Sequence, residues 1–202
     1  MNKGKLAIFF SIILMCIAVF TFQYTNIFDD NQPKQIVIQS GDYVVGRNMD
    51  EGIYDVIVLN GQVKFMQMKM NEGDRWLAVR LRHGEHVHVS GNGKVRLKPS
   101  HFEKIERRGD GIYQIKHSGF YVVGRQIPEG EYILTYMSKN AEEKPFVQLL
   151  SSNRDVIHTY DFQNRKDKYY KVVCKKGQIL EVYKNLFAES KHVVVILKKM
   201  NR

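Results

Sequence analysis

The chain has 202 residues, enough for one large domain or two small ones. Its 31 Lys and Arg residues against 21 Asp and Glu residues give a formal net charge of +10, which bears on partners and not on fold. There are two cysteines, Cys16 and Cys174. A small disulfide-stabilised scaffold is therefore excluded.

The amino terminus predicts a membrane anchor. Residues 1–5 carry Lys3 and Lys5, and residues 6–22 form an uncharged apolar run. This run is about as long as the shortest membrane-spanning helices and longer than the core of a cleavable signal peptide. The two lysines predict a cytoplasmic tail at residues 1–5, with everything after the anchor outside. Residues 23–34 are polar, and we predict that they form a short stalk.

Two alternatives concern processing of this segment. Cleavage as a signal peptide is disfavoured because no Ala-x-Ala site follows residue 22. Lipidation of Cys16 after cleavage is disfavoured because the bulky Met15 precedes it. Placing Cys16 in the bilayer leaves Cys174 without an intrachain partner, so the outer region must fold without a disulfide.

A motif occurs twice with a constant offset of 78 residues. Residues 40–54 return as residues 118–132, and the copies share the following positions: Gly41, Tyr43, Gly46, Gly52 and Tyr54 match Gly119, Tyr121, Gly124, Gly130 and Tyr132. A duplicated structural unit is indicated. We therefore predict a first repeat at residues 35–108 and a second repeat at residues 109–202.

Both repeats predict short β-strands separated by turn residues. In the first repeat these are residues 36–38, 43–45, 54–59, 63–70, 76–81, 87–89 and 95–97. In the second they are residues 121–123, 132–136, 146–150, 156–160, 169–174, 179–183 and 193–197. The fold class is therefore all-β, as two tandem antiparallel β-sandwich (jelly-roll-like) modules after the transmembrane helix.

Short sequence signals also predict the turns and one helix between these strands. Asn60-Gly61 and Asn92-Gly93 predict hairpin turns, and Ile127-Pro128-Glu129-Gly130 predicts a type I turn that joins the two strands of the motif. Residues 100–108 fit a short helix, with capping-box spacing between Ser100 and Glu103.

Alternation of side chains predicts the core. A second alignment, with an offset of 93, matches residues 76–89 with residues 169–182. It places five pairs of side chains on inward faces: Leu77/Tyr170, Val79/Val172, Leu81/Cys174, Val87/Leu180 and Val89/Val182.

The motif also resembles a known pattern, Gly-x-Tyr-x-Val-Gly-x-Asp-Ile-Pro-x-Gly-x-Tyr followed by a Leu-x-x-Gly-Gln-x-Leu-x-Val strand. This pattern occurs in membrane-anchored or secreted proteins of Gram-positive bacteria whose function is unknown. Residues 119–132 and 176–182 are the better copy, whereas Met49 and Asp50 depart from the usual Ile-Pro. The resemblance implies a small β-sandwich and carries no active site.

Three histidines are weak candidates for a metal site. His86 and His88 lie on one face of a predicted strand, near His83, and a His-x-His pair can bind a divalent cation. The second repeat has Ile179 and Glu181 at the matching positions, and no carboxylate completes the set at a convincing spacing. Solvated histidines on a sheet face are the simpler interpretation, so neither a metal nor another cofactor is expected.

A cationic surface is the other candidate. It comprises Arg75, Arg80, Arg82, Arg165, Lys166, Lys168, Lys171, Lys175 and Lys176. Such charge can attract anionic wall polymers, lipid headgroups or an acidic envelope protein, and it can equally keep β edges soluble. Stacking of single-stranded nucleic acid on Tyr169 and Tyr170 is disfavoured by the predicted location outside the cell and by the core position of Tyr170.

Enzyme signatures are missing from the sequence, which contains neither Gly-x-Ser-x-Gly nor His-Glu-x-x-His nor a phosphate-cradling loop. We therefore expect a non-enzymatic binding module of a bacterial cell envelope, with no catalytic residue. A structural subunit that pairs with another membrane protein is the alternative. A metal-dependent enzyme comes third.

Overall fold

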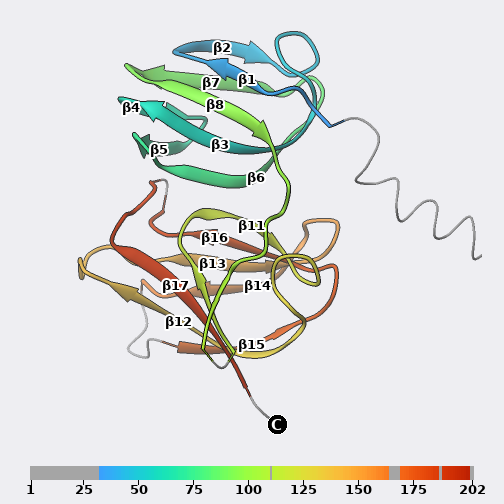
Figure 1. Cartoon of the computed structure of the whole chain (residues 1–202), viewed down its shortest axis with the longest axis vertical. Coiled ribbons are helices and arrows are strands. Elements are labelled where there is room, and N and C mark those ends of the chain that lie inside the picture. The colour runs from blue at the N-terminus through green and yellow to red at the C-terminus, as the bar shows by residue number, and fades with distance from the viewer. Residues whose placement is uncertain (1–31, 110, 164–168, 187, 201–202) are drawn as a thin grey trace, which may run out of the picture. The chain divides into compact units, whose positions relative to one another are not determined.

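The computed structural model describes residues 32–109, 111–163, 169–186 and 188–200. The predicted tail and anchor lie outside these residues. The described residues form an all-β, sandwich-like fold without a helix, and residues Pro33–Arg202 belong to one compact unit (Figure 1). No helix in these ranges is long and apolar enough to cross a membrane.

The strands follow the predicted pattern closely. They are β1 (Ile36–Ile38), β2 (Gly41–Val44), β3 (Gly52–Asn60), β4 (Gln62–Phe65), β5 (Met68–Asn71), β6 (Arg75–Leu81), β7 (His86–Gly91), β8 (Lys94–Pro99), β9 (Glu106–Arg108), β10 (Ile112–Ile115), β11 (Ser118–Val122), β12 (Gly130–Ser138), β13 (Phe146–Leu150), β14 (Val156–Asp161), β15 (Tyr169–Cys174), β16 (Ile179–Tyr183) and β17 (Val193–Lys199).

The strand order of the first repeat recurs in the second. One eight-stranded sheet has the order β1-β8-β3-β6-β11-β16-β13-β14, beside a four-stranded sheet β2-β7-β4-β5 and a five-stranded sheet β15-β12-β17-β10-β9. Adding nine to each strand number of the first repeat converts its two rows, 1-8-3-6 and 2-7-4-5, into those of the second, 10-17-12-15 and 11-16-13-14. Only β9 has no counterpart among the described strands.

Each repeat has its own hydrophobic core. One cluster draws on β1–β8 and the other on β10–β17. Eight side chains of the five predicted core pairs are buried, and Tyr170 packs against the second core. Leu77 also packs against the second core, which differs from the prediction.

A β-bulge explains the position of Leu77. Tyr54 pairs with Val79 and Val56 pairs with Trp76, so two residues of β6 face Asp55 alone. Ala78 has a positive φ of 53°, and its amide donates to Asp55 Oδ1 at 3.0 Å. The extra residue reverses the alternation, so Trp76 points into the first core and Leu77 points away from it.

The duplicated motif is a crossing between sheets, and the predicted hairpin is wrong. In each repeat the strand before the turn and the strand after it lie in different sheets. The tight turn comes earlier than predicted, at residues 124–127 and 46–49: Gly124 N donates to Ile127 O at 2.6 Å, and Gly46 N donates to Met49 O at 2.7 Å. Gly46 and Gly124 have φ values of 87° and 90°, which favour glycine.

The two Asn-Gly sequences are also crossings. Asn60-Gly61 joins β3 to β4 and Asn92-Gly93 joins β7 to β8, and both connections change sheet. The two crossings are hydrogen-bonded to each other. Asn60 Oδ1 accepts a hydrogen bond from Lys94 N at 3.0 Å, and Asn92 Oδ1 accepts one from Gln62 N at 3.0 Å. The asparagines therefore link two crossings rather than closing hairpins.

The predicted helix at residues 100–108 is not present. Residues 100–105 have no regular structure and are followed by β9. Their amides donate to distant backbone carbonyls instead: Ser100 N donates to Ile53 O of β3 at 2.9 Å, and Ile105 N donates to Gln126 O in the turn after β11 at 3.4 Å. Tertiary hydrogen bonds and the positive φ of Phe102 (52°) override the local helical signal.

Tyrosines of the motif hold each crossing in the same way. Tyr54 Oη donates to Asp50 O at 2.9 Å, and Tyr132 Oη donates to Pro128 O at 2.6 Å. Both rings are fully buried. Burial raises the pKa of Tyr54 to about 12 and that of Tyr132 further, so both hydroxyls stay protonated donors at neutral pH.

This equivalence predicts matched effects of two substitutions. Tyr54→Phe and Tyr132→Phe should each lower the free energy of unfolding by about 1 kcal/mol, because each leaves one carbonyl without its donor. Urea denaturation of the single variants measures both. A loss in only one of them would contradict the equivalence of the two crossings.

Candidate functional site

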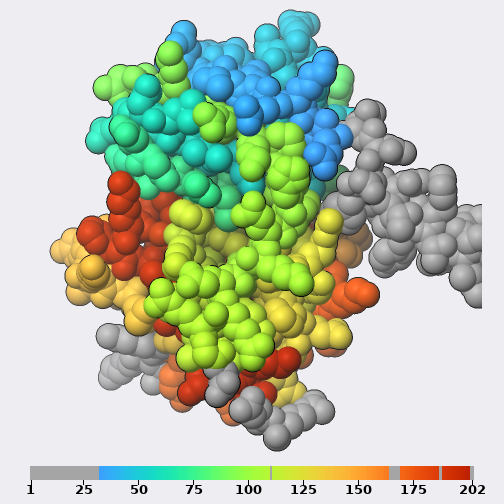
Figure 2. Space-filling model, viewed as in Figure 1, coloured from blue at the N-terminus to red at the C-terminus, as the bar shows by residue number. Residues whose placement is uncertain are grey.

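A cavity of about 230 Å³ lies where the two repeats meet. Side chains of the first repeat reach it from β3, β6, β8 and the segment 100–106, and side chains of the second repeat reach it from β10 and β11. Its polar lining residues are Asp55, Arg75, Lys98, Ser100, Glu103, Lys104, Glu106, Gln114, Lys116, His117, Tyr121 and Gln126. In Figure 2 the yellow-green segment after β8 crosses from one repeat onto the other. We call this cavity the junction cleft.

Cations of the cleft are only partly neutralised. Glu106 pairs with Lys116 and with Arg108 Nε at 3.2 Å, and its hydrogen bond from Lys116 is the largest cause that lowers the pKa of this carboxyl. The Asp55 carboxylate accepts a hydrogen bond from the Ala78 amide. Within the described ranges, Arg75, Lys98 and Lys104 form no ion pair, and neither do the cleft carboxylates of Asp55 and Glu103, so three unpaired cations face two unpaired carboxylates. The cleft therefore has cations available for an anion.

The pKa of His117, which lines the cleft, is lowered in the folded chain. Burial, and to a smaller extent the nearby Lys184, Arg75 and Lys116, together lower its pKa to about 4. Tyr121 Oη donates to the His117 carbonyl at 2.6 Å, which fixes the backbone at this point. The imidazole is therefore neutral at pH 7, and the charges that shift its pKa are positive.

This depressed pKa predicts a pH dependence. Between pH 6.5 and about 4, His117 binds a proton more readily in the unfolded chain than in the folded chain. Its contribution is complete above pH 6.5 and is lost as the pH falls through this window. Because the ring is partly exposed, we expect a loss of about 1–2 kcal/mol.

Thermal unfolding of the parent and of His117→Gln at pH 7 and pH 4.5 measures this contribution. The loss of stability between pH 7 and pH 4.5 should be smaller in the variant than in the parent. Comparing the two proteins cancels the titration of all other groups. Equal pH dependence in the two proteins would contradict the assignment.

A buried ion pair lies beside the junction. Lys184 Nζ is 3.0 Å from Glu189 Oε1, and both side chains are almost completely buried. Glu189 Oε2 accepts from Ser118 N at 3.1 Å, and Lys184 Nζ donates to Lys116 O at 2.6 Å. The Glu189 amide donates to Lys69 O of the first repeat at 2.9 Å. The ion pair therefore fixes the backbone at a place where the two repeats are in contact.

Backbone pairing joins the repeats directly. β6 and β11 pair in parallel, with Ser118 opposite Trp76 and Gly119 opposite Leu77. A Cβ on Gly119 would lie 2.7 Å from Leu77 O and 2.9 Å from Leu77 N. Only glycine fits this approach, because backbone atoms cannot move away as a flexible side chain can.

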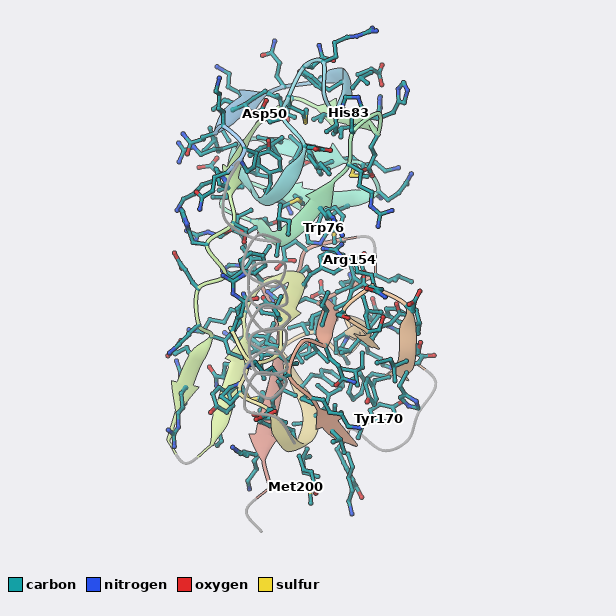
Figure 3. All side chains as sticks on the ribbon, turned by 90° about the vertical axis from the view of Figure 1, so that its right-hand side faces the viewer. Asp50, Trp76, His83, Arg154, Tyr170 and Met200 are labelled. Atoms are coloured by element: carbon teal, nitrogen blue, oxygen red, sulfur yellow. The ribbon has the colours of Figure 1, made fainter. Side chains whose placement is uncertain are left out.

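A group of arginines lies near the same strands. The Arg154 guanidinium stacks on Phe120 of β11 at 4.5 Å from the ring centroid. Burial and the nearby Arg80 lower its pKa, while Glu181 opposes this change. Figure 3 labels Arg154 in the second repeat and Trp76 of β6 in the first. Arg80 and Arg82 were predicted from sequence, and Arg154 was missed because it is isolated in a loop.

The other predicted cations are spread over the second repeat. Lys171 is exposed on β15, and Lys175 and Lys176 follow that strand. Lys175 N donates to Gln178 Oε1 at 2.7 Å. Arg165, Lys166 and Lys168 lie outside the described residues. Among the members of the predicted cationic surface that the structure describes, Arg75 alone lines the junction cleft.

The histidines lie apart from the cleft. His86 and His88 are exposed on one face of β7, as predicted, and His88 Nδ1 is 2.7 Å from Asp42 Oδ1. His83 packs over Gly46, where a Cβ would lie 2.2 Å from the ring. In the part of the chain that the structure describes, no three His, Cys, Asp or Glu side chains could hold a metal ion together.

Several residues of the cleft escaped prediction from sequence. Lys98 precedes a segment that was interpreted as a helix and Lys104 lies within it, while His117 precedes the second motif without any local signal. His117 does occupy the position before the repeated Ser-Gly, where the first repeat has Gln39. A comparison of the copies could have singled it out as a difference.

Comparison with known proteins identified no relative: no protein-family model, curated protein or solved structure matches the chain.

Proposed function

We propose that the chain is a membrane-anchored, extracytoplasmic, non-enzymatic binding module of a bacterial cell envelope. In this proposal residues 6–22 are the anchor, and each set of eight strands is one jelly-roll sandwich. The recurrence of the strand order supports the two-module interpretation. The resemblance of the motif to repeats of Gram-positive envelope proteins supports the location.

We infer that the ligand is an anionic wall polymer bound at the junction cleft. The observation that carries this inference is the set of cations there, Arg75, Lys98 and Lys104, which form no ion pair with a described carboxylate. Guanidinium and ammonium groups bind phosphate oxygens through charge-assisted hydrogen bonds. A cavity of about 230 Å³ accommodates one phosphate-sized group of a polymer and not a bilayer.

Binding of a glycerol phosphate polymer to the purified full-length chain in nonionic detergent tests this function. Arg75→Gln combined with Lys98→Gln should weaken binding about tenfold, because two charges of the cleft are lost. Lys64→Gln combined with Lys69→Gln is the matched control, since both lysines are exposed on paired strands of the four-stranded sheet. Equal weakening by both pairs would contradict a site in the cleft.

Pairing with another membrane protein is the second candidate. It is favoured by β14, an edge strand of the eight-stranded sheet on which Val156 is 58% and Ile157 is 50% exposed. Exposed apolar edge strands are templates for strand addition. Crosslinking in cells through a photoreactive residue at Ile157 tests it, and a discrete protein adduct would favour this candidate over the polymer.

A further inference from the structure

The outward face of the five-stranded sheet is unusually apolar. Three of its side chains, Met137 on β12 and Tyr169 and Val173 on β15, are each 53% exposed. The inward positions of the same strands fill the second core. These residues are therefore not needed for the core, and they gather on one side of the molecule.

Strand register places more apolar side chains and two lysines among them. Ile133 of β12 lies opposite Lys171 of β15 and Lys198 of β17. Thr135 lies between Tyr169 and Ile196, and Met137 lies opposite Val194. Figure 1 shows β12, β15 and β17 together in the second repeat. We call this outward surface the β12–β15–β17 face.

Lysines of this face are free of acidic partners in the described structure. Neither Lys171 nor Lys198 forms an ion pair with a described carboxylate, although one acidic residue, Glu131 opposite Val173, lies on the same side of β12. Their long apolar stems can lie on Ile133 while the ammonium groups reach outward. Tyrosine beside aliphatic side chains and lysines is the composition that binds the boundary between lipid headgroups and acyl chains.

Charge argues against a second copy as the occupant. In a two-fold symmetric contact this face would meet itself, so four lysines, two copies each of Lys171 and Lys198, would share one interface with only two Glu131 carboxylates. An anionic surface is complementary instead. A bilayer with anionic headgroups attracts lysines that lie near its surface.

The length of the chain outside the described residues places a bilayer within reach. Residues 23–32 connect the apolar run to Pro33. Even fully extended, these residues span no more than about 36 Å. We propose that the β12–β15–β17 face docks on the anionic leaflet of the membrane that holds the anchor. This inference rests on the anchor in the proposed function and is independent of the junction cleft.

A site-specific label tests the docking. In a Cys16→Ser background the remaining Cys174 is buried, and burial raises the pKa of its thiol to about 12, so it reacts slowly. Val173→Cys introduces a thiol on the face, and Lys64→Cys introduces a control thiol on the exposed side of β4. Each full-length variant is labelled with an environment-sensitive fluorophore and reconstituted into vesicles that contain nitroxide lipids.

In vesicles of phosphatidylglycerol and phosphatidylcholine, nitroxide lipids should quench the label at position 173 about threefold more than the label at position 64. Quenching at 173 should fall in high salt, in pure phosphatidylcholine, and in the Lys171→Gln, Lys198→Gln variant. Equal quenching of the two labels in chains that float with the vesicles would overturn the docking while leaving the anchor intact.

Two further outcomes overturn the proposal. Chains that do not float with vesicles would contradict both the anchor and the docking. A 173-labelled chain that is shielded from nitroxide lipids and instead crosslinks to a second copy through this face would assign the face to a dimer. Neither outcome changes the polymer-binding assay, so failure of the docking and failure of the cleft are distinguishable.

Discussion

Replacement of Glu189 by alanine is expected to lower the free energy of unfolding by about 3–5 kcal/mol, because it leaves the buried Lys184 ammonium without its counter-charge. The Lys184–Glu189 pair is 3.0 Å long and almost fully excluded from water. Burial raises the pKa of Glu189, while Lys184 and Ser118 oppose this change, so the carboxylate depends on these partners. Chemical denaturation of the purified variant measures the loss.

A double substitution separates the role of the pair from that of its packing. Glu189→Leu combined with Lys184→Met removes both charges and retains apolar volume, so it should be less destabilising than Glu189→Ala alone. Asp42→Asn, which affects the exposed contact with His88, should change stability little. A Glu189→Ala variant as stable as the parent would show that Lys184 is not buried as described.

The second large effect is expected at Gly119. Gly119→Ala should destabilise the fold by about 2–4 kcal/mol, because the new methyl group would collide with the Leu77 backbone in the parallel β6–β11 pairing. Thermal and urea unfolding measure the loss directly.

Gly41→Ala is a matched control for this substitution. Gly41 is the counterpart of Gly119 in the first repeat and has nearly the same φ, 157° against 156°. A Cβ on Gly41 would meet only the Tyr43 ring, at 3.5 Å, which is ordinary contact. The difference between the two variants isolates the collision from the backbone conformation. If both lose the same stability, the repeats do not share a sheet at this point.

The strands could be predicted from sequence because their signals are local. Residues 146–150, 169–174 and 179–183 were predicted with the observed bounds, since β-branched and aromatic residues alternate there between glycines and polar turns. Buried positions such as Val79, Val172 and Leu180 followed from the same alternation.

Partnerships between strands were predicted less well because they are not local. Asn60-Gly61 carries the sequence of a hairpin turn, yet it joins strands of two sheets, since its asparagine bonds to the backbone of a distant corner. The bulge at Ala78 reversed the alternation of β6, and residues 100–105 bond to Ile53 and Gln126 instead of forming a helix. Each of these errors reflects tertiary hydrogen bonds that no local pattern contains.

The candidate site could be predicted only as a class of chemistry. Excess positive charge indicated an anionic partner, and Arg75 belongs to the cleft as well as to that prediction. The other members of the cleft come together only because β6 and β11 pair and because residues 100–106 cross between repeats. The spacing of these residues in the sequence does not predict that they lie together.

The most direct test of the account is the pKa of His117, followed by NMR of the histidine rings and assigned by its loss in His117→Gln. In the free chain we expect a pKa of about 4, because the ring is partly buried among Lys184, Arg75 and Lys116. A glycerol phosphate polymer bound in the junction cleft should raise this pKa by about 1, because the anion stabilises the imidazolium. An unchanged pKa in a chain saturated with polymer would contradict binding in the cleft.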